Sequence, residues 1–188
     1  MQPFIAQNTF SHIKKLTLIS FLLLSASCND KKRQSTVRRS DPFSLVRNIK
    51  LALPSGKMID TKLAITNREQ TIGLSGKKLA QMTKTEGLLF FYLNDGRRQF
   101  WMPNTYFDIH IIFLDKDLKV VGLERNVPHH PGKQEPPKIY RTKAYLARHV
   151  LEIRADSPLG EEIAIDTKFA WYSKTSLLET ESHIHRWR

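Results

Sequence analysis

Short apolar segments separated by turn signals occupy the middle of the chain. Some alternate with polar residues and others form brief continuous runs, and both patterns are typical of β-strands. The predicted strands are 49–53, 58–66, 86–93, 97–102, 108–115, 118–127, 150–154 and 163–165. Neighbouring strands are joined into hairpins by the turns Pro54-Ser55-Gly56, Asn94-Asp95-Gly96 and Lys116-Asp117.

The remaining segments predict little regular structure. Asn67 suits the N-cap of a short helix that ends near Gly73 or Gly76. Residues 128–138 contain four prolines, which predicts an irregular loop. The polar tail over 173–188 is expected to be frayed. The pattern therefore predicts a mainly β (α+β) fold, a compact antiparallel barrel-like or sandwich domain over 48–172 with one or two short helices.

The first 28 residues have the order of a targeting segment. Lys14 and Lys15 precede the apolar run 16–24, and the small residues 25–27 lead to Cys28. This order predicts a signal peptide over 1–27, since the run is shorter than the roughly 20 residues that span a bilayer. Small residues before a lone cysteine resemble the lipobox of bacterial lipoproteins, which implies lipidation of Cys28. The alternatives are an ordinary signal peptide that leaves a free thiol, and a buried N-terminal helix.

Composition limits the class of protein. The 188 residues are 40 % hydrophobic and 26 % charged, which is typical of one globular domain. A single cysteine excludes a disulfide framework within the chain and a multi-cysteine zinc module.

The net charge of +12 comes from 30 Lys and Arg against 18 Asp and Glu. Residues 29–50 carry seven of the basic residues and two of the acidic ones, so the segment 28–47 is predicted to be a disordered basic tether. Next to a lipid anchor such a tether is attracted to anionic headgroups, although it also suits a plain solvated spacer. Arg97-Arg98-Gln99-Phe100-Trp101 mixes basic and aromatic groups, but a nucleic acid partner is not expected for an exported protein.

The clearest candidate site is the segment that begins at Trp101, which is predicted to leave the sheet through a corner at Pro103. In one interpretation Trp101 packs into the core and the polar groups after it form a satisfied structural corner. In the other, Trp101 is a stacking platform for a sugar ring or a planar ligand, and the polar groups converge at a pocket mouth. The candidate ligand-binding residues are Trp101, Asn104, Thr105 and Asp108.

Other chemical patterns are weak. Asp108, Asp115 and Asp117 lie near strand ends, where aspartates usually form turns rather than the paired carboxylates of glycosidases. His129 and His130 are adjacent in a loop and point in different directions, so no metal site is expected. We find no Ser-His-Asp set, phosphate-binding glycine loop or nucleotide fingerprint, and we expect no cofactor.

Residues 62–166 carry a series of short motifs in a fixed order. They are Ala64, Arg68-Glu69, Gly73-Leu74, Gly87-Leu88-Leu89-Phe90, Phe100-Trp101-Met102-Pro103-Asn104-Thr105, Phe107-Asp108-Ile109 and Val150-Leu151-Glu152. Together they resemble a bacterial and archaeal family known as domain of unknown function 192, or uncharacterised protein family 0127. This chain departs from the family pattern at Lys77, Leu88 and Pro103. The resemblance implies a compact β-rich domain, often exported, with no established activity.

These observations predict an exported, membrane-anchored protein of the bacterial cell envelope that acts as a binding or accessory module. The expected partners are the membrane, through the lipid anchor and tether, and an envelope glycan, peptide or protein. The alternative is an enzyme that uses Asp108 and Asn104 in a pocket beside Trp101, which requires the two polar groups to converge on a cavity. A third class, a domain that only docks a partner protein, predicts an exposed apolar patch.

Overall fold

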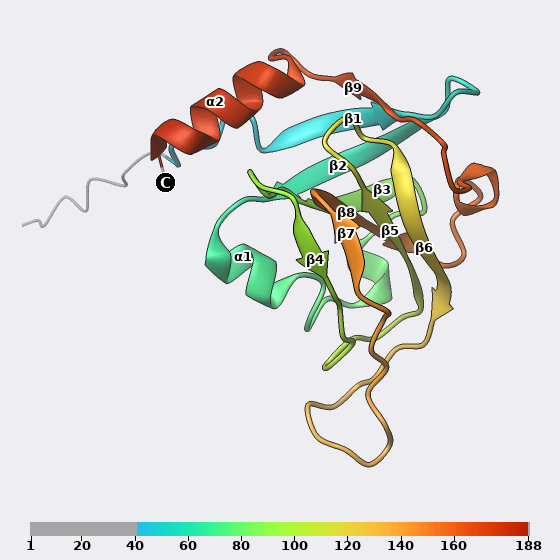
Figure 1. Cartoon of the computed structure of the whole chain (residues 1–188). Coiled ribbons are helices and arrows are strands. Elements are labelled where there is room, and N and C mark those ends of the chain that lie inside the picture. Colours follow the sequence, from blue (N-terminus) through green and yellow to red (C-terminus); the bar gives the residue numbers. More distant parts are fainter. Residues whose placement is uncertain (1–40, 188) are drawn as a thin grey trace, which may run out of the picture. The chain divides into compact units, whose positions relative to one another are not determined.

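A seven-stranded sheet forms the centre of the part of the chain that the structure describes (Figure 1). The computed structural model describes residues 41–187, so the predicted signal peptide, Cys28 and the tether up to residue 40 lie outside it. The strands of the large sheet are β1 (Asn48–Ala52), β2 (Met58–Ala64), β3 (Glu86–Phe90), β5 (Ile109–Leu114), β6 (Val120–Val127), β8 (His149–Arg154) and β9 (Ala170–Tyr172). The other elements are β4 (Gly96–Arg98), β7 (Tyr145–Ala147), α1 (Asn67–Ile72), α2 (Leu177–Trp187) and 3₁₀ turns at Leu79–Gln81 and Gly160–Glu162.

The spatial order of the large sheet is β6-β5-β8-β3-β2-β1-β9. Its strands pair antiparallel except β2 and β3, which are parallel because the connection between them crosses over through α1. The mainly β prediction is confirmed, as are the hairpins β1–β2 and β5–β6. The sheet is an open, curled half-barrel rather than a closed barrel, and the bridge between Lys119 and Lys168 brings its two ends together at one point.

Both faces of the sheet are covered along its central strands. Every residue of β5 and β8 is buried, which explains why five of the six residues of β5 are apolar. β8 buries three apolar residues together with His149, Glu152 and Arg154. One face packs against a cluster that includes Leu51, Phe91 and Leu151. The opposite face packs against a cluster that includes Phe90 and Phe113, under the small β4–β7 sheet.

One predicted strand has the wrong length and partner, and another is absent. Of residues 97–102, only the first two belong to a strand, β4, which pairs with β7. It cannot pair with β3, because β3 already has β2 on one side and β8 on the other. The predicted strand at 163–165 is a turn, in which the Thr167 amide donates to the Ala164 carbonyl, and the last strand is β9. The loop prediction for 128–138 is confirmed, since this segment contains no helix or strand.

Ordered structure extends beyond both predicted limits of the β-rich domain, 48 and 172. Phe43 and Val46, which we assigned to the disordered tether, are buried in the core. The predicted frayed tail is wrong as well, because residues 177–187 form α2 and Ile184 on that helix is fully buried. Within residues 41–187, neither helix is long and apolar enough to cross a membrane.

Candidate functional site

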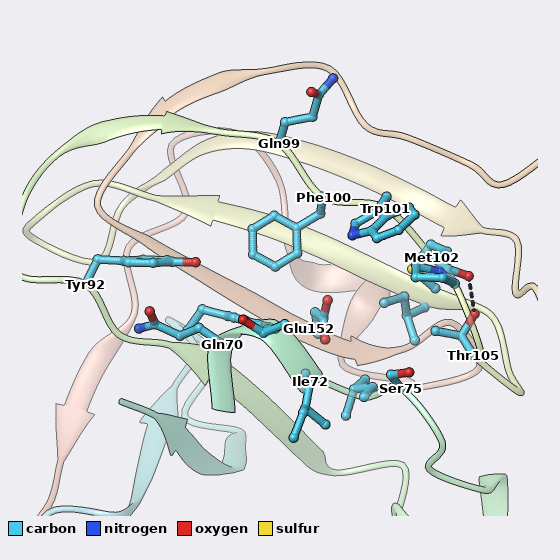
Figure 2. A pocket seen from close by; sticks show the side chains of 16 residues that line it. Gln70, Ile72, Ser75, Tyr92, Gln99, Phe100, Trp101, Met102, Thr105 and Glu152 are labelled. Carbon is cyan, nitrogen blue, oxygen red and sulfur yellow. Dashed lines mark hydrogen bonds between the residues drawn. The ribbon is translucent and has the colours of Figure 1, made fainter. Parts of the chain in front are cut away.

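A cavity of about 320 Å³ opens on the sheet face that carries Phe90, between the turn after α1 and the segment 99–103 (Figure 2). Two of the four predicted site residues, Trp101 and Thr105, line it. Asn104 and Asp108 are not among its lining residues. The sixteen lining residues are Gln70, Thr71, Ile72, Gly73, Leu74, Ser75, Phe90, Tyr92, Gln99, Phe100, Trp101, Met102, Pro103, Thr105, Ile109 and Glu152.

Hydrogen bonds hold Asn104 in a structural corner. Its backbone adopts a positive φ of 53°, which asparagine tolerates better than most residues. The side-chain amide donates to Ser75 Oγ at 3.1 Å, and the side-chain oxygen accepts from the Tyr106 hydroxyl at 3.1 Å. The Asn104 carbonyl accepts from the Gly76 amide at 2.7 Å. Asn104 therefore ties the segment after α1 to the corner. It does not line the cavity itself, but it holds Ser75, which does.

Thr105 is buried and fully bonded at the same corner. Its hydroxyl donates to the Met102 carbonyl at 3.0 Å and accepts from the His130 amide at 2.9 Å. The two residues also share a backbone bond from Thr105 N to the His130 carbonyl at 2.8 Å. Thr105 thus fixes the proline-rich loop against the wall of the cavity, and the structural interpretation of this residue is the one that the geometry favours.

Asp108 faces the loop rather than the cavity. One carboxylate oxygen accepts from both the backbone amide and the ring Nδ1 of His129, at 2.8 and 2.7 Å. Burial alone would raise the pKa of Asp108, but the hydrogen bonds from His129 outweigh it and lower the pKa. The two polar groups of the enzymatic alternative, Asp108 and Asn104, therefore do not converge on this cavity.

Trp101 stands at the cavity rim with half of its surface exposed. A bridge to Arg141 holds its backbone, and the Arg141 guanidinium lies 4.9 Å from the centre of the indole ring. Arg141 does not line the cavity. Trp101 is thus supported by protein on one side and available to a ligand at the rim.

Glu152 is the residue that sequence reasoning missed as part of the site. It lies on β8, where its neighbours across the sheet are Leu88 on β3 and Ile111 on β5. Its side chain projects into the cavity, between Phe100 and Ile72 in the view of Figure 2. Among residues 41–187, no group forms a hydrogen bond with its buried Oε2 atom. Burial raises the pKa of Glu152 to about 8, so the folded protein holds a neutral carboxylic acid there at pH 7.

The wall opposite the strands comes from α1 and the turn that follows it. α1 starts from Thr66, not from the predicted Asn67, since Thr66 and Glu69 form a capping box. It ends at Gly73 as predicted, with a φ of 51° that favours glycine. A Cβ at Gly73 would lie 2.9 Å from the Phe90 ring and 3.9 Å from Glu152 Oε2. A larger residue here would therefore crowd the carboxyl group.

Aromatic rings make up much of the remaining wall. Phe90, Tyr92, Phe100 and Trp101 all line the cavity, and the Phe90 and Phe100 rings meet edge to face at 4.7 Å. Gln99 turns away from the cavity in Figure 2, and its amide donates to the Thr142 carbonyl at 2.9 Å. The site is thus an aromatic cavity around one neutral acid. Within residues 41–187, no three histidine, cysteine, aspartate or glutamate side chains lie together as metal ligands would.

Solved structures share this fold. One is a proposed transcription regulator from Sinorhizobium meliloti 1021, with 21 % sequence identity and a TM-score of 0.53 over 66 % of this chain and 92 % of that one. Another is a protein of unknown function from Novosphingobium aromaticivorans DSM 12444, with 25 % identity and a TM-score of 0.52 over 66 % of this chain and 84 % of that one. No curated protein sequence matches the chain.

The resemblance inferred from the short motifs is confirmed by a family model. That model matches residues 50–171, which are well over half of the chain and include β2 to β8 in full and every residue that lines the cavity. The chain therefore belongs to the family of domain of unknown function 192, which is described as an uncharacterised ACR.

Proposed function

We propose that this protein is a small-ligand-binding module and that the cavity around Glu152 is its binding site. The observation that carries the proposal is the buried Glu152 carboxyl, whose Oε2 atom has no partner among residues 41–187 although it borders a cavity. A buried polar group without a partner costs free energy. A ligand that supplies the missing partner recovers that free energy, and ligand pockets typically combine apolar walls with a few such polar groups.

The size of the cavity limits the ligand. A volume of about 320 Å³ is at the lower end of the range for small-molecule sites. It suits a small molecule, or a single sugar or side chain from the envelope glycan or peptide that we expect as a partner. Binding is favoured over the enzymatic alternative because Asp108 and Asn104 lie outside the lining.

Ligand-detected saturation-transfer NMR tests this proposal. The probes are small neutral, cationic and anionic ring compounds, screened against the full chain. We expect some of them to bind. Trp101→Ala removes part of the aromatic wall and Glu152→Leu removes the buried carboxyl group, so each is expected to weaken that binding about tenfold or more. Trp187→Ala is the matched control, because Trp187 is exposed on α2 and does not line the cavity. Binding that both cavity variants leave unchanged would place the ligand elsewhere.

We also propose that the module acts at the cell envelope, anchored through a lipid on Cys28. The signal-peptide pattern of residues 1–27 and the basic residues that follow Cys28 support this location. Such an anchor would hold the cavity near the membrane, where glycans, peptides and lipid fragments are available as ligands.

Radiolabelled palmitate measures the anchor directly. The full chain produced in a bacterial host is expected to incorporate the label and to fractionate with membranes. Cys28→Ala is expected to abolish the incorporation completely, because the chain contains no other cysteine. Label that persists in the Cys28→Ala variant would contradict lipidation at this residue.

A further inference from the structure

We propose that the cavity around Glu152 is a site for a small organic cation, an ammonium compound whose charge meets the Glu152 carboxylate and whose body contacts the aromatic walls. This inference rests on the proposed binding function and names the chemical class of the ligand. Two features of the described residues support it: the missing counter-charge and the aromatic walls.

The cavity contains one ionisable acid and no basic group to balance it. None of the sixteen lining residues is a lysine, arginine or histidine. The residues beside Glu152 on the neighbouring strands, Leu88 and Ile111, are apolar. Tyr92 is the other titratable residue of the lining, and Arg98 on β4 stacks on the Tyr92 ring without lining the cavity. A positive charge that pairs with Glu152 must therefore come from a ligand.

The walls favour a cation over a neutral or anionic ring. The faces of aromatic rings carry partial negative charge and attract ammonium and guanidinium groups. The protein already uses this attraction outside the cavity, where Arg98 lies 3.7 Å from the Tyr92 ring centre and Arg141 lies 4.9 Å from that of Trp101. Since neither arginine lines the cavity, both rings still contribute surface to it. An anionic ligand would instead meet π-electron density and an acid.

The charge balance of binding follows from the state of Glu152. Burial raises the pKa of this carboxyl to about 8, so at pH 7 the empty site holds the proton. When an organic cation binds, the carboxyl loses that proton to the buffer and the carboxylate pairs with the cation. The net charge of the cavity is then zero both before and after binding. A neutral ligand would instead accept a hydrogen bond from the protonated acid and release no proton.

Isothermal titration calorimetry on the full chain distinguishes a cationic ligand, which releases a proton on binding, from a neutral one, which does not. The probes are benzyltrimethylammonium, which has a permanent charge and no proton to lose, and the neutral compound benzyl alcohol. Titrations at pH 7 in phosphate and in Tris, whose ionisation enthalpies differ, give the number of protons released. We expect the cation to bind at least tenfold more tightly than the alcohol and to release close to one proton. Its dissociation constant is expected to fall about tenfold per pH unit between pH 6 and pH 7.

Glu152→Gln is expected to weaken binding of the cation at least tenfold and to abolish proton release. Glu161→Gln is the matched control, since Glu161 is exposed and does not line the cavity. If benzyl alcohol binds and the cation does not, or if the cation binds Glu152→Gln as tightly as the wild type, the choice of ligand class is wrong while the binding function stands. If neither probe binds at millimolar concentration, and the NMR screen also finds no ligand, the binding function fails too.

Discussion

Glu152→Gln is expected to have a higher free energy of unfolding than the wild type at pH 8. The difference between the two proteins is expected to grow by about 3–4 kcal/mol between pH 5 and pH 8. The pKa of Glu152 is about 8 in the folded state, and its ordinary value in an unfolded chain is 4.5. Between these two values the folded protein keeps a proton that the unfolded chain loses. Stability therefore falls as pH rises from about 4.5 to about 8, and changes little from this source above pH 8. Glutamine has no proton to lose and removes this dependence.

Other buried groups also titrate, so the difference between the two proteins is the quantity to measure. Burial lowers the pKa of His149 to about 3, against an ordinary value of 6.5. The unfolded chain thus binds a proton at His149 between pH 3 and pH 6.5, and stability falls as pH falls through that range. This contribution opposes that of Glu152 in part of its range. Because wild type and variant share it, it cancels when one profile is subtracted from the other.

Urea unfolding followed by circular dichroism, at pH values from 5 to 8, gives the two profiles. Glu161→Gln, at an exposed position, is the control for removing a carboxylate from the surface. Parallel profiles for wild type and Glu152→Gln would mean that the Glu152 carboxyl is hydrated and ionised in the folded protein. That result would remove the buried neutral acid on which the proposed site depends.

At position 152, an apolar residue would give a more stable fold, whereas the proposed binding function needs an acid. β8 is otherwise a strand of buried residues in the middle of the sheet, and a leucine at this position would pack against Leu88 and Ile111 without a charge to bury. A folded domain that holds an unpartnered acid at this place carries a cost that packing does not explain. Binding sites are the usual places for such costs, because the ligand completes them.

The sequence was sufficient for the parts of the fold that local chemistry determines. The hairpin β1–β2 follows from alternation and the turn at Gly56, and the hairpin β5–β6 follows from a buried run and a tight turn. The order of the strands in the sheet was not predictable in the same way. β3 pairs in parallel with β2 and antiparallel with β8, whose paired residues lie at least sixty positions away along the chain, and no local pattern specifies such a pairing.

The candidate site was partly predictable for the same reason. Trp101 and Thr105 belong to one conspicuous motif, and both line the cavity. Glu152 comes from a distant strand and reaches the cavity only because β8 pairs with β3 and β5. A signal was present, since Glu152 lies between Leu151 and Ile153 in the predicted strand 150–154, and a glutamate is rarely buried. Its importance depends on the missing partner, which only the three-dimensional structure reveals.

The C-terminal helix was missed although the sequence carries its start signal. Ser176 and Glu179 form reciprocal hydrogen bonds, from the Glu179 amide to Ser176 Oγ at 3.2 Å and from the Ser176 amide to the Glu179 carboxylate at 2.7 Å. This is the capping box that serine and glutamate produce at this spacing. The segment is mostly polar, and its apolar stripe is narrow. Leu177 and Ile184 are seven residues apart, which places them on one helix face.

Ile184→Ala is expected to lower the free energy of unfolding of the whole domain by about 2–4 kcal/mol, since Ile184 is fully buried in the same cluster as Leu51 and Phe91. Other contacts also tie α2 to the domain: the His183 ring bonds the Pro42 carbonyl at 2.7 Å and Glu181 pairs with Arg148 at 3.3 Å. The helix should therefore unfold together with the sheet rather than separately.

Leu178→Ala is the matched control on the same helix. Leu178 is 71 % exposed, so its truncation is expected to change stability by less than about 0.5 kcal/mol. Urea midpoints of the two variants, measured by the near-ultraviolet signal of the core aromatic residues, distinguish a docked helix from an independent one. A shift for Ile184→Ala as small as that for Leu178→Ala would mean that α2 contributes nothing to the core. A large shift for Ile184→Ala alone would mean that the folded domain needs its last eleven described residues, 177–187, for full stability.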